Sequence, residues 1–311
     1  MIPARVLVSY GSHGIVSTGE AIYDCKWRRG TGRPLCGDQV QIQIDRGGNA
    51  ALNAIQPRAS EFKRGDNRGR AQPIAANVDQ VIIVIAPKPA PSAFLIDRYL
   101  VAIKDMGLPA IVVVNKYDLS DDASHCSGDT LLQRLEVYAH LQLPTITTST
   151  KQNPPGIDAL ASCLRDRVSI LVGQSGVGKS SLINAMIPDR EEQTGALSDA
   201  TGKGRHTTTR TAWIKLPEGG AVIDSPGVWE YGLWHMPAAA IAERFPDFEP
   251  YLGCCRFRDC SHRHEPGCAL RQAISAGQLP QHRLDAYHNI LDMQQQQGYD
   301  EGMENIRKTR K

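Results

Sequence analysis

The chain has 311 residues and a formal net charge of +2, so it is long enough for two or three domains. No apolar run approaches the roughly 18 residues of a membrane-spanning helix, and "MIPARVLVSYGSHG" at the start lacks the apolar core of a secretion signal. This argues against a membrane-spanning helix, and we expect a soluble, cytoplasmic protein.

Residues 1–73 carry the basic excess, with 11 Lys and Arg against 6 Asp and Glu. Short segments such as "ARVLVSY" and "GDQVQIQID", punctuated by Gly, Asp and Asn, are typical of a small all-β barrel. "EFKRGDNRGRAQP" is polar and basic, which indicates a linker or flexible loop. The charge indicates either a solvated face or contacts to RNA phosphates. The candidate contacts are Lys26, Arg28, Arg29, Arg33, Lys63, Arg64, Arg68 and Arg70.

Residues 74–235 alternate between apolar runs and segments of helical spacing. The strand-like runs are "QVIIVIA", "LPAIVVVN", "LPTITTST" and "VSILVG". The helical segments are "SAFLIDRYLVAIKDMG", "DTLLQRLEVYAHLQ" and "GIDALASCLRD". Because most of these strands are apolar throughout, we expect parallel strands covered on both faces, a doubly wound α/β sheet.

In chain order, the first motif is "NKYD", which ends a strand. The Asp118 carboxylate can accept hydrogen bonds from N1–H and the exocyclic amino group of guanine, and adenine would leave it unpaired. Asn115 would brace the pocket, and the Lys116 stem would cover the ring. A second loop resembles the Ser-Ala-Lys loop that lies on guanine, and it consists of Ser149, Thr150 and Lys151.

"GQSGVGKS" fits the phosphate-binding pattern G-x-x-x-x-G-K-[ST], and it follows a strand and opens a helix. Its glycines let backbone N–H groups surround phosphate at a helix N-terminus. Lys179 can reach the β and γ phosphates, and Ser180 can bind Mg²⁺. The expected contacts of this loop are Gly173, Gln174, Ser175, Gly176, Val177, Gly178, Lys179, Ser180 and Ser181.

Two further segments complete the expected nucleotide site. In "AVIDSPGVWE", Asp224 ends a strand and would hold Mg²⁺, while the N–H of Gly227 would sense the γ-phosphate. In "TGKGRHTTTRTAWI" a threonine would complete the Mg²⁺ shell, Thr208 being favoured over Thr207. The phosphate loop (G1) usually comes first. Here "NKYD" (G4) and the Ser-Thr-Lys loop (G5) precede it, and the threonines (G2) and Asp-Ser-Pro-Gly (G3) follow, which gives the order G4-G5-G1-G2-G3. Since domains tolerate joining of neighbouring termini, the sequence predicts a circularly permuted GTPase.

After about residue 234 the strands stop, and a spacing of C-x₄-C-x-H-x₅-C is followed by helical segments. Three thiolates and one imidazole suit a closed, structural Zn²⁺ site, and a reducing compartment disfavours disulfides. By spacing alone Cys254 and His264 remain possible substitutes. The expected ligands are Cys255, Cys260, His262 and Cys268.

The motif order, "GRHTTT", "DSPGVWEYGL" and "CRFRDCSHRHEPGCAL" together resemble the bacterial ribosome small subunit-dependent GTPase A family (RsgA/YjeQ) over essentially the whole chain. The resemblance implies an OB-fold RNA-binding domain over 1–73, a circularly permuted GTPase over 74–235 and a zinc-binding C-terminal domain over 236–311. It implies hydrolysis of GTP to GDP and phosphate, stimulated by the small (30S) ribosomal subunit, in late maturation of that subunit. Family spacing also favours Cys255 over Cys254.

The resemblance also bears on catalysis. Val228 stands where other GTPases carry a water-orienting Gln. The family's alternative is His206, which would orient or relay through water, although a structural role in its loop stays open. We expect His206→Ala to lose subunit-stimulated turnover and to keep GTP affinity.

The implied cofactors are GTP or GDP, Mg²⁺ and one Zn²⁺ per chain, and the implied partner is the small subunit with its 16S rRNA. We expect a monomer without membrane contact. The alternative is an RNA-binding scaffold that uses GTP as a slow structural ligand, while a metabolic GTPase or kinase lacks a visible substrate constellation. Because residues 207–227 end close to the zinc domain, a change at the γ-phosphate is expected to move that domain against the barrel.

Overall fold

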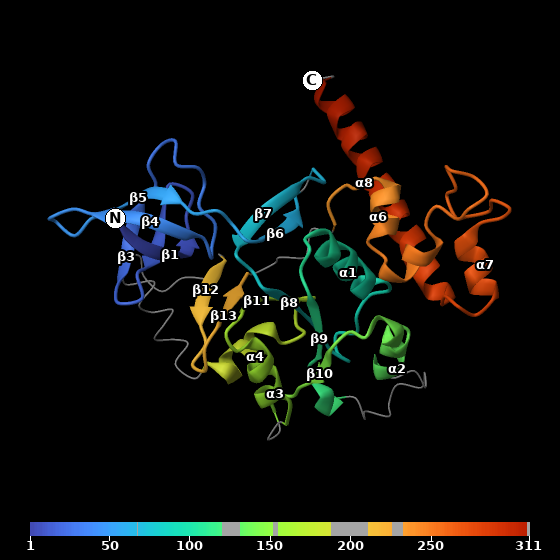
Figure 1. Cartoon of the computed structure of the whole chain (residues 1–311), viewed down its shortest axis with the longest axis horizontal. Helices are drawn as coiled ribbons and strands as arrows, with labels where there is room; N and C mark the ends of the chain where they lie inside the picture. The colour runs from blue at the N-terminus through green and yellow to red at the C-terminus, as the bar shows by residue number, and fades with distance from the viewer. Residues whose placement is uncertain (67, 120–130, 152–154, 188–210, 226–232, 310–311) are drawn as a thin grey trace.

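The structure is a computed structural model that describes residues 1–66, 68–119, 131–151, 155–187, 211–225 and 233–309 (Figure 1). Within these ranges no helix has the length and apolar character needed to cross a bilayer. Eleven strands form one continuous sheet in the order β10-β9-β8-β11-β13-β12-β1-β2-β3-β5-β4. The sheet therefore joins the two β-containing parts that the sequence predicts.

The N-terminal strands close into a barrel, which confirms that prediction. Strand β1 pairs with both β2 and β4, and β5 links β3 to β4, so the ring has no open edge. Alternate residues point inward, and Val6, Ile42 and Leu52 are completely buried there. The five strands are β1 (Ile2–Ser9), β2 (His13–Ser17), β3 (Ile22–Lys26), β4 (Gln39–Ile44) and β5 (Ala50–Ile55).

The linker expected over 61–73 is wrong, because these residues lie in an antiparallel hairpin of β6 (Glu61–Gly65) and β7 (Ala71–Ala76). The Asp66 carboxylate accepts a hydrogen bond from the backbone N–H of Arg70 at 2.9 Å, which closes the turn. Asp66, Gly69 and Arg70 thus belong to the turn of a hairpin rather than to a flexible connection.

The hairpin is anchored at both ends. Phe62 near its base is completely buried in the core beneath it. At its tip, the carbonyl of Gly69 accepts a hydrogen bond from the backbone N–H of His235 at 2.7 Å. Gly69 has φ +63, and a Cβ there would lie 1.8 Å from the His235 ring, so only glycine fits. The hairpin therefore fastens the chain just before the C-terminal helices.

The second part is the predicted doubly wound sheet. The strand β11, which leads into the phosphate loop, lies between β8 and β13, and β12 forms an antiparallel edge. The other neighbours pair in parallel. The bounds are β8 (Gln80–Ile85), β9 (Ala110–Val114), β10 (Thr145–Thr147), β11 (Val168–Val172), β12 (Ala212–Lys215) and β13 (Ala221–Asp224).

Helices cover both faces of this sheet (Figure 1). Alternating residues of β8 explain the two layers: Ile83 faces the core that contains α1, whereas Ile82 and Val84 face the core that contains α3 and α4. The helix expected over 129–142 is shorter, since only α2 and the 3₁₀ turn η2 form in its described part. The bounds are α1 (Leu95–Asp105), η1 (Tyr117–Leu119), α2 (Leu131–Glu136), η2 (Ala139–Leu141), α3 (Pro155–Leu164) and α4 (Lys179–Met186).

The barrel joins the edge of the second part directly. Val8 of β1 pairs with Ala212 of β12. Trp213 packs against a small apolar cluster that includes Leu7 and Ile15 of the barrel, and the Arg5 guanidinium lies 5.4 Å from the centre of the indole. The barrel therefore contacts the strand that follows the predicted switch threonines.

The C-terminal part is helical and packs on α1 through Val101 and Ala102 (Figure 1). Helix α8 extends away from the body of the molecule toward the C-terminus and ends at residue 309 (Figure 1). The bounds are α6 (Ala238–Glu243), η3 (Pro246–Tyr251), α7 (Ala269–Ser275) and α8 (Gln281–Thr309).

A buried ionic network crosses this contact. The Arg283 guanidinium binds Asp97 of α1 and meets the two oxygens of Asp247 at 2.7 and 3.0 Å. The side chains of Arg283 and Asp97 are 1% and 0% exposed. The Tyr138 hydroxyl donates to Asp97 at 2.6 Å, which satisfies a further lone pair. The network ties α8 to α1 and to the segment between α2 and η2.

Candidate nucleotide and zinc sites

The phosphate loop connects β11 to α4, as the motif requires. Its lysine, Lys179, donates to the carbonyl oxygens of Gly173 and Gln174 at 2.7 and 2.9 Å. These are neutral acceptors that an anionic phosphate can replace with stronger, charge-assisted hydrogen bonds. Ser180 and Ser181 lie exposed in the first turn of α4, where a ligand can reach them.

A buried hydrogen-bond chain ties the base motif to this loop. Asn115 donates through Nδ2 to the carbonyl of Val177 at 2.9 Å, and its Oδ1 accepts from the Thr148 hydroxyl at 3.0 Å. Gly178 has φ +96, and a Cβ there would lie 2.3 Å from Asn115 Nδ2, so glycine permits this contact. Sequence reasoning missed Thr148, although its place directly before Ser149 at a strand end was a usable signal.

The two predicted guanine loops lie side by side. The Ser149 hydroxyl donates to Asp118 Oδ1 at 2.6 Å, and the backbone N–H of Tyr117 donates to the Thr148 carbonyl at 3.0 Å. Lys116 donates through Nζ to the Gly176 carbonyl at 2.6 Å, which holds its stem across the loops. The Asp118 carboxylate is thereby oriented by a side chain from the loop that follows β10. Thr150 and Lys151 are exposed beside them.

Asp224 lies at the same edge of the sheet, because β13 runs parallel to β11 and ends there. The next residue, Ser225, shares a hydrogen bond of 2.8 Å with the hydroxyl of Thr211, which precedes β12. This pair links the two strands at the ends that lead toward the predicted switch residues. His206, Thr207, Thr208, Gly227 and Val228 themselves lie outside the described residues.

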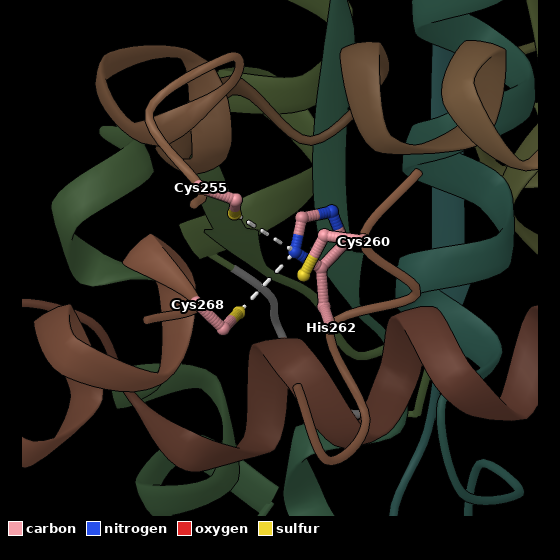
Figure 2. Close-up of side chains that lie close together, drawn as sticks. All are labelled: Cys255, Cys260, His262 and Cys268. Carbon is pink, nitrogen blue, oxygen red and sulfur yellow. Dashed lines mark hydrogen bonds between the residues drawn. The ribbon is translucent and has the colours of Figure 1, made fainter. Parts of the chain in front are cut away.

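The predicted zinc ligands converge from separate turns of the C-terminal part (Figure 2). Their ligand atoms all lie within 4.8 Å of one another. His262 Nδ1 is 3.6 Å from Cys255 Sγ and 3.4 Å from Cys268 Sγ. Zn–S and Zn–N bonds of about 2.3 and 2.0 Å at a tetrahedral angle require S···N separations of about 3.5 Å. The four residues, Cys255, Cys260, His262 and Cys268, therefore fit one tetrahedral zinc ion.

The surroundings of the cluster also suit a cation. Burial and the neighbouring thiols raise the pKa of Cys260 to about 12, a cost that a bound cation would reverse. Burial lowers the pKa of His262, which favours the neutral imidazole that binds metals. The backbone N–H of Ala269 donates to Cys255 Sγ at 3.3 Å. Cys254 instead lies 3.8 Å from the carbonyl oxygens of Pro250 and Leu252, outside the cluster.

The basic candidates for RNA contact divide by exposure. Lys63 and Arg64 of the hairpin are half-buried. The Arg70 guanidinium is paired with the Asp66 carboxylate at 2.7 Å. The exposed members of the set are Lys26, Arg28, Arg29, Arg33, Arg68 and Arg70.

Known proteins share these features. The model of the RsgA GTPase family matches residues 55–234. The small ribosomal subunit biogenesis GTPase RsgA of Chromohalobacter salexigens is 46% identical over 258 residues, covering 83% of this chain and 74% of the relative. Its counterpart in Ectopseudomonas mendocina is 44% identical over 270 residues, covering 87% and 78%.

Two solved structures have the same fold. YjeQ from Thermotoga maritima matches with a TM-score of 0.74 and 28% identity, over 94% of this chain and 98% of its own. YloQ, a circularly permuted GTPase, matches with a TM-score of 0.70 and 28% identity, over 95% and 96%. Both matches extend across the barrel, the sheet and the C-terminal helices.

Proposed function

Because this chain belongs to the RsgA GTPase family, we propose that it hydrolyses GTP to GDP and phosphate in the biogenesis of the small ribosomal subunit, the role its curated relatives are named for. The observation that carries the proposal is the buried chain from Thr148 through Asn115 to the Val177 carbonyl. It joins a base-reading motif to a phosphate loop although sixty-two positions separate Asn115 from Val177. A ligand with a base at one end and phosphates at the other can contact both motifs at this edge of the sheet.

We assign guanine selection to Asp118, which Ser149 holds in place. The Lys116 stem would cover the guanine ring, and Thr150 and Lys151 would lie beside the base. A carboxylate oriented in this way accepts hydrogen bonds from N1–H and the amino group of guanine. Adenine offers no matching donors, so the carboxylate would be left unpaired against it. Asn115 acts as the brace rather than as the main base contact, because both ends of its amide are already bonded within the protein.

The phosphates would lie in the loop from Gly173 to Ser181, with Lys179 moved from its carbonyl partners onto the β and γ phosphates. Mg²⁺, when bound, neutralises charge on these phosphates, and Ser180, Thr208 and Asp224 would hold it. Gly227 would donate its N–H to the γ-phosphate. We propose that His206 orients the attacking water, directly or through a second water.

The zinc ion that fits Cys255, Cys260, His262 and Cys268 would be structural, since four protein ligands leave no open position. It would hold together the turns between η3 and α7, which contain little secondary structure of their own. The loaded domain would then present its exposed basic residues to a partner.

For the partner we propose the small subunit and its 16S rRNA, bound in the cytoplasm by a monomer that makes no membrane contact. The barrel supports this, since its basic residues are mostly exposed and can meet phosphates without reading sequence. The family assignment favours turnover over the alternative of an RNA scaffold that only stores GTP.

One experiment tests the proposal. Phosphate release is measured with and without purified small subunits, and co-sedimentation is measured in parallel with GDP and with a non-hydrolysable GTP analogue. We expect stimulated hydrolysis and tighter sedimentation with the analogue. Subunit binding without any turnover would instead support the scaffold.

His206→Ala should retain GTP affinity and lose the stimulation, and an equal loss of affinity would contradict its catalytic role.

A further inference from the structure

A cavity of about 430 Å³ lies where the barrel, the hairpin β6–β7 and the ends of β12 and β13 meet. It is separate from the guanine and phosphate loops. Its volume is in the range of about 300–1,000 Å³ that is usual for small-molecule sites, and exceeds what one phosphate group needs. Its polar lining residues include Ser9, Arg33, Arg58, Arg64, Gln72, Thr211 and Ser225.

The lining is positive. Three arginines contribute to it, and no acidic residue is among the described residues that line it. Arg58 is held from behind, since it meets both oxygens of Asp38 at 2.8 Å and Glu61 at 2.7 Å. Because these carboxylates balance its charge and occupy most of its N–H groups, Arg58 braces the wall. Arg33 and Arg64 also line the cavity and add positive charge to it.

We infer that this cavity binds one phosphate-bearing nucleotide unit of RNA, an inference that rests on the proposed function. Arginine offers paired N–H donors that match phosphate oxygens. Pro34, Leu35 and Ile74 add an apolar wall against which a sugar and base can pack. A free mononucleotide has the same groups. However, residues 1–73 carry 11 Lys and Arg against 6 Asp and Glu, and this excess of positive charge favours a polyanion.

The position of the cavity makes this site regulatory. Thr211 and Ser225 form part of its wall and are hydrogen-bonded to each other at 2.8 Å. Ser225 directly follows Asp224, the proposed Mg²⁺ residue. An RNA unit in the cavity therefore contacts both strands that lead to the switch residues. Linkage requires the effect to be mutual: if RNA binding alters the nucleotide site, the bound nucleotide alters RNA affinity by the same factor.

The test compares Arg33→Gln and Arg64→Gln with Arg46→Gln, which removes one exposed charge in the turn between β4 and β5, outside the cavity. Co-sedimentation of each full-length variant with small subunits is measured over a salt series. Each cavity variant should bind about tenfold more weakly. Each should also lower the slope of log affinity against log salt by about 1. Arg46→Gln should match the wild type.

Further controls keep the outcomes distinct. GDP affinity and melting temperature identify a misfolded variant. In that case Arg64→Lys, which preserves the charge, takes the place of Arg64→Gln and should lose less affinity for the subunit. Cytidine monophosphate, which the guanine site excludes, is titrated against the protein alone. Arg64-dependent binding of this probe with unchanged subunit affinity would overturn RNA as the ligand.

The inference is overturned, and the proposed function kept, if the wild type sediments with subunits and all three glutamine variants behave alike. A wild type that neither sediments with subunits nor is stimulated by them removes the proposed function and the RNA assignment together.

Discussion

Replacing Arg283 by methionine should destabilise the contact between the C-terminal helices and α1 more than any surface charge change. The substitution keeps an unbranched stem, removes the guanidinium and leaves two buried carboxylates without their arginine partner, Asp97 at 0% and Asp247 at 5% exposure. At an effective dielectric constant of about 20, each pair near 4 Å is worth about 4 kcal/mol of attraction, against which desolvation must be set. Breaking buried pairs costs about 3–5 kcal/mol, the loss we expect in the free energy of unfolding.

The assay combines urea unfolding with amide hydrogen exchange, because several domains need not unfold in one step. Protection should fall in α1 and α8 and stay unchanged in the barrel. The matched control is Arg244→Met, which removes a partly exposed pair with Asp105 of 3.1 Å and should cost about 1 kcal/mol or less. The triple variant that adds Asp97→Asn and Asp247→Asn should recover much of the loss. An Arg283→Met variant no less stable than the control would refute the reasoning.

The same network predicts that the stability of the protein depends on pH. Burial raises the pKa of Asp247, but the hydrogen bonds and charge of Arg283 outweigh burial, so the pKa of this carboxyl is lowered overall. A lowered folded-state pKa stabilises the protein above the unfolded pKa of about 4, and that stability is lost as the pH falls further. Arg283→Met should flatten this acid limb of a stability–pH curve, and an unchanged limb would exclude the network as its source.

Three further results are expected. Cys260→Ser should lose stoichiometric zinc by elemental analysis and melt at lower temperature, whereas Cys254→Ser should keep both; zinc retained in the first would contradict the ligand set. Gly178→Ala should abolish nucleotide binding in calorimetry because its Cβ would meet the Asn115 amide, while Gly277→Ala, also at positive φ but in open space, should bind normally. Asp118→Asn should weaken GTP about 10⁴-fold or more, with GDP affected equally, since the base contact is common to both; preserved affinity would argue against its role.

Local motifs were predictable because their chemistry depends on short spacing. The phosphate loop, "NKYD" and the zinc spacing each indicated side chains that the fold brings together, and the order of motifs predicted a permuted sheet. The hairpin at 61–73 was not predictable in this way, since Gly, Asp and Asn serve equally in a linker and in a turn. The pairing of β6 with β7 and the burial of Phe62 distinguish the two, and burial depends on the rest of the fold.

Contacts between distant segments were the harder part. Arg283 and Asp97 lie 186 positions apart, and nothing near either residue signals a buried partner. The pairing of Val8 with Ala212 is equally long-range. The motion of the zinc domain expected from motif order stays a prediction, and the Arg283 network adds a condition to it. Any such motion must carry α1 along or break that network.

The continuity of the sheet from β10 to the barrel has a practical consequence for dissecting the protein. A fragment that begins after β5 or after β7 would lack the barrel. It would leave β12 as an uncovered edge at the point where Val8 now pairs with Ala212, and would expose the Trp213 face that the barrel covers. Bare strand edges with apolar neighbours promote association between molecules. An isolated nucleotide-binding fragment should therefore aggregate where the whole chain does not, so its poor behaviour would report a missing neighbour rather than a defect in the nucleotide site.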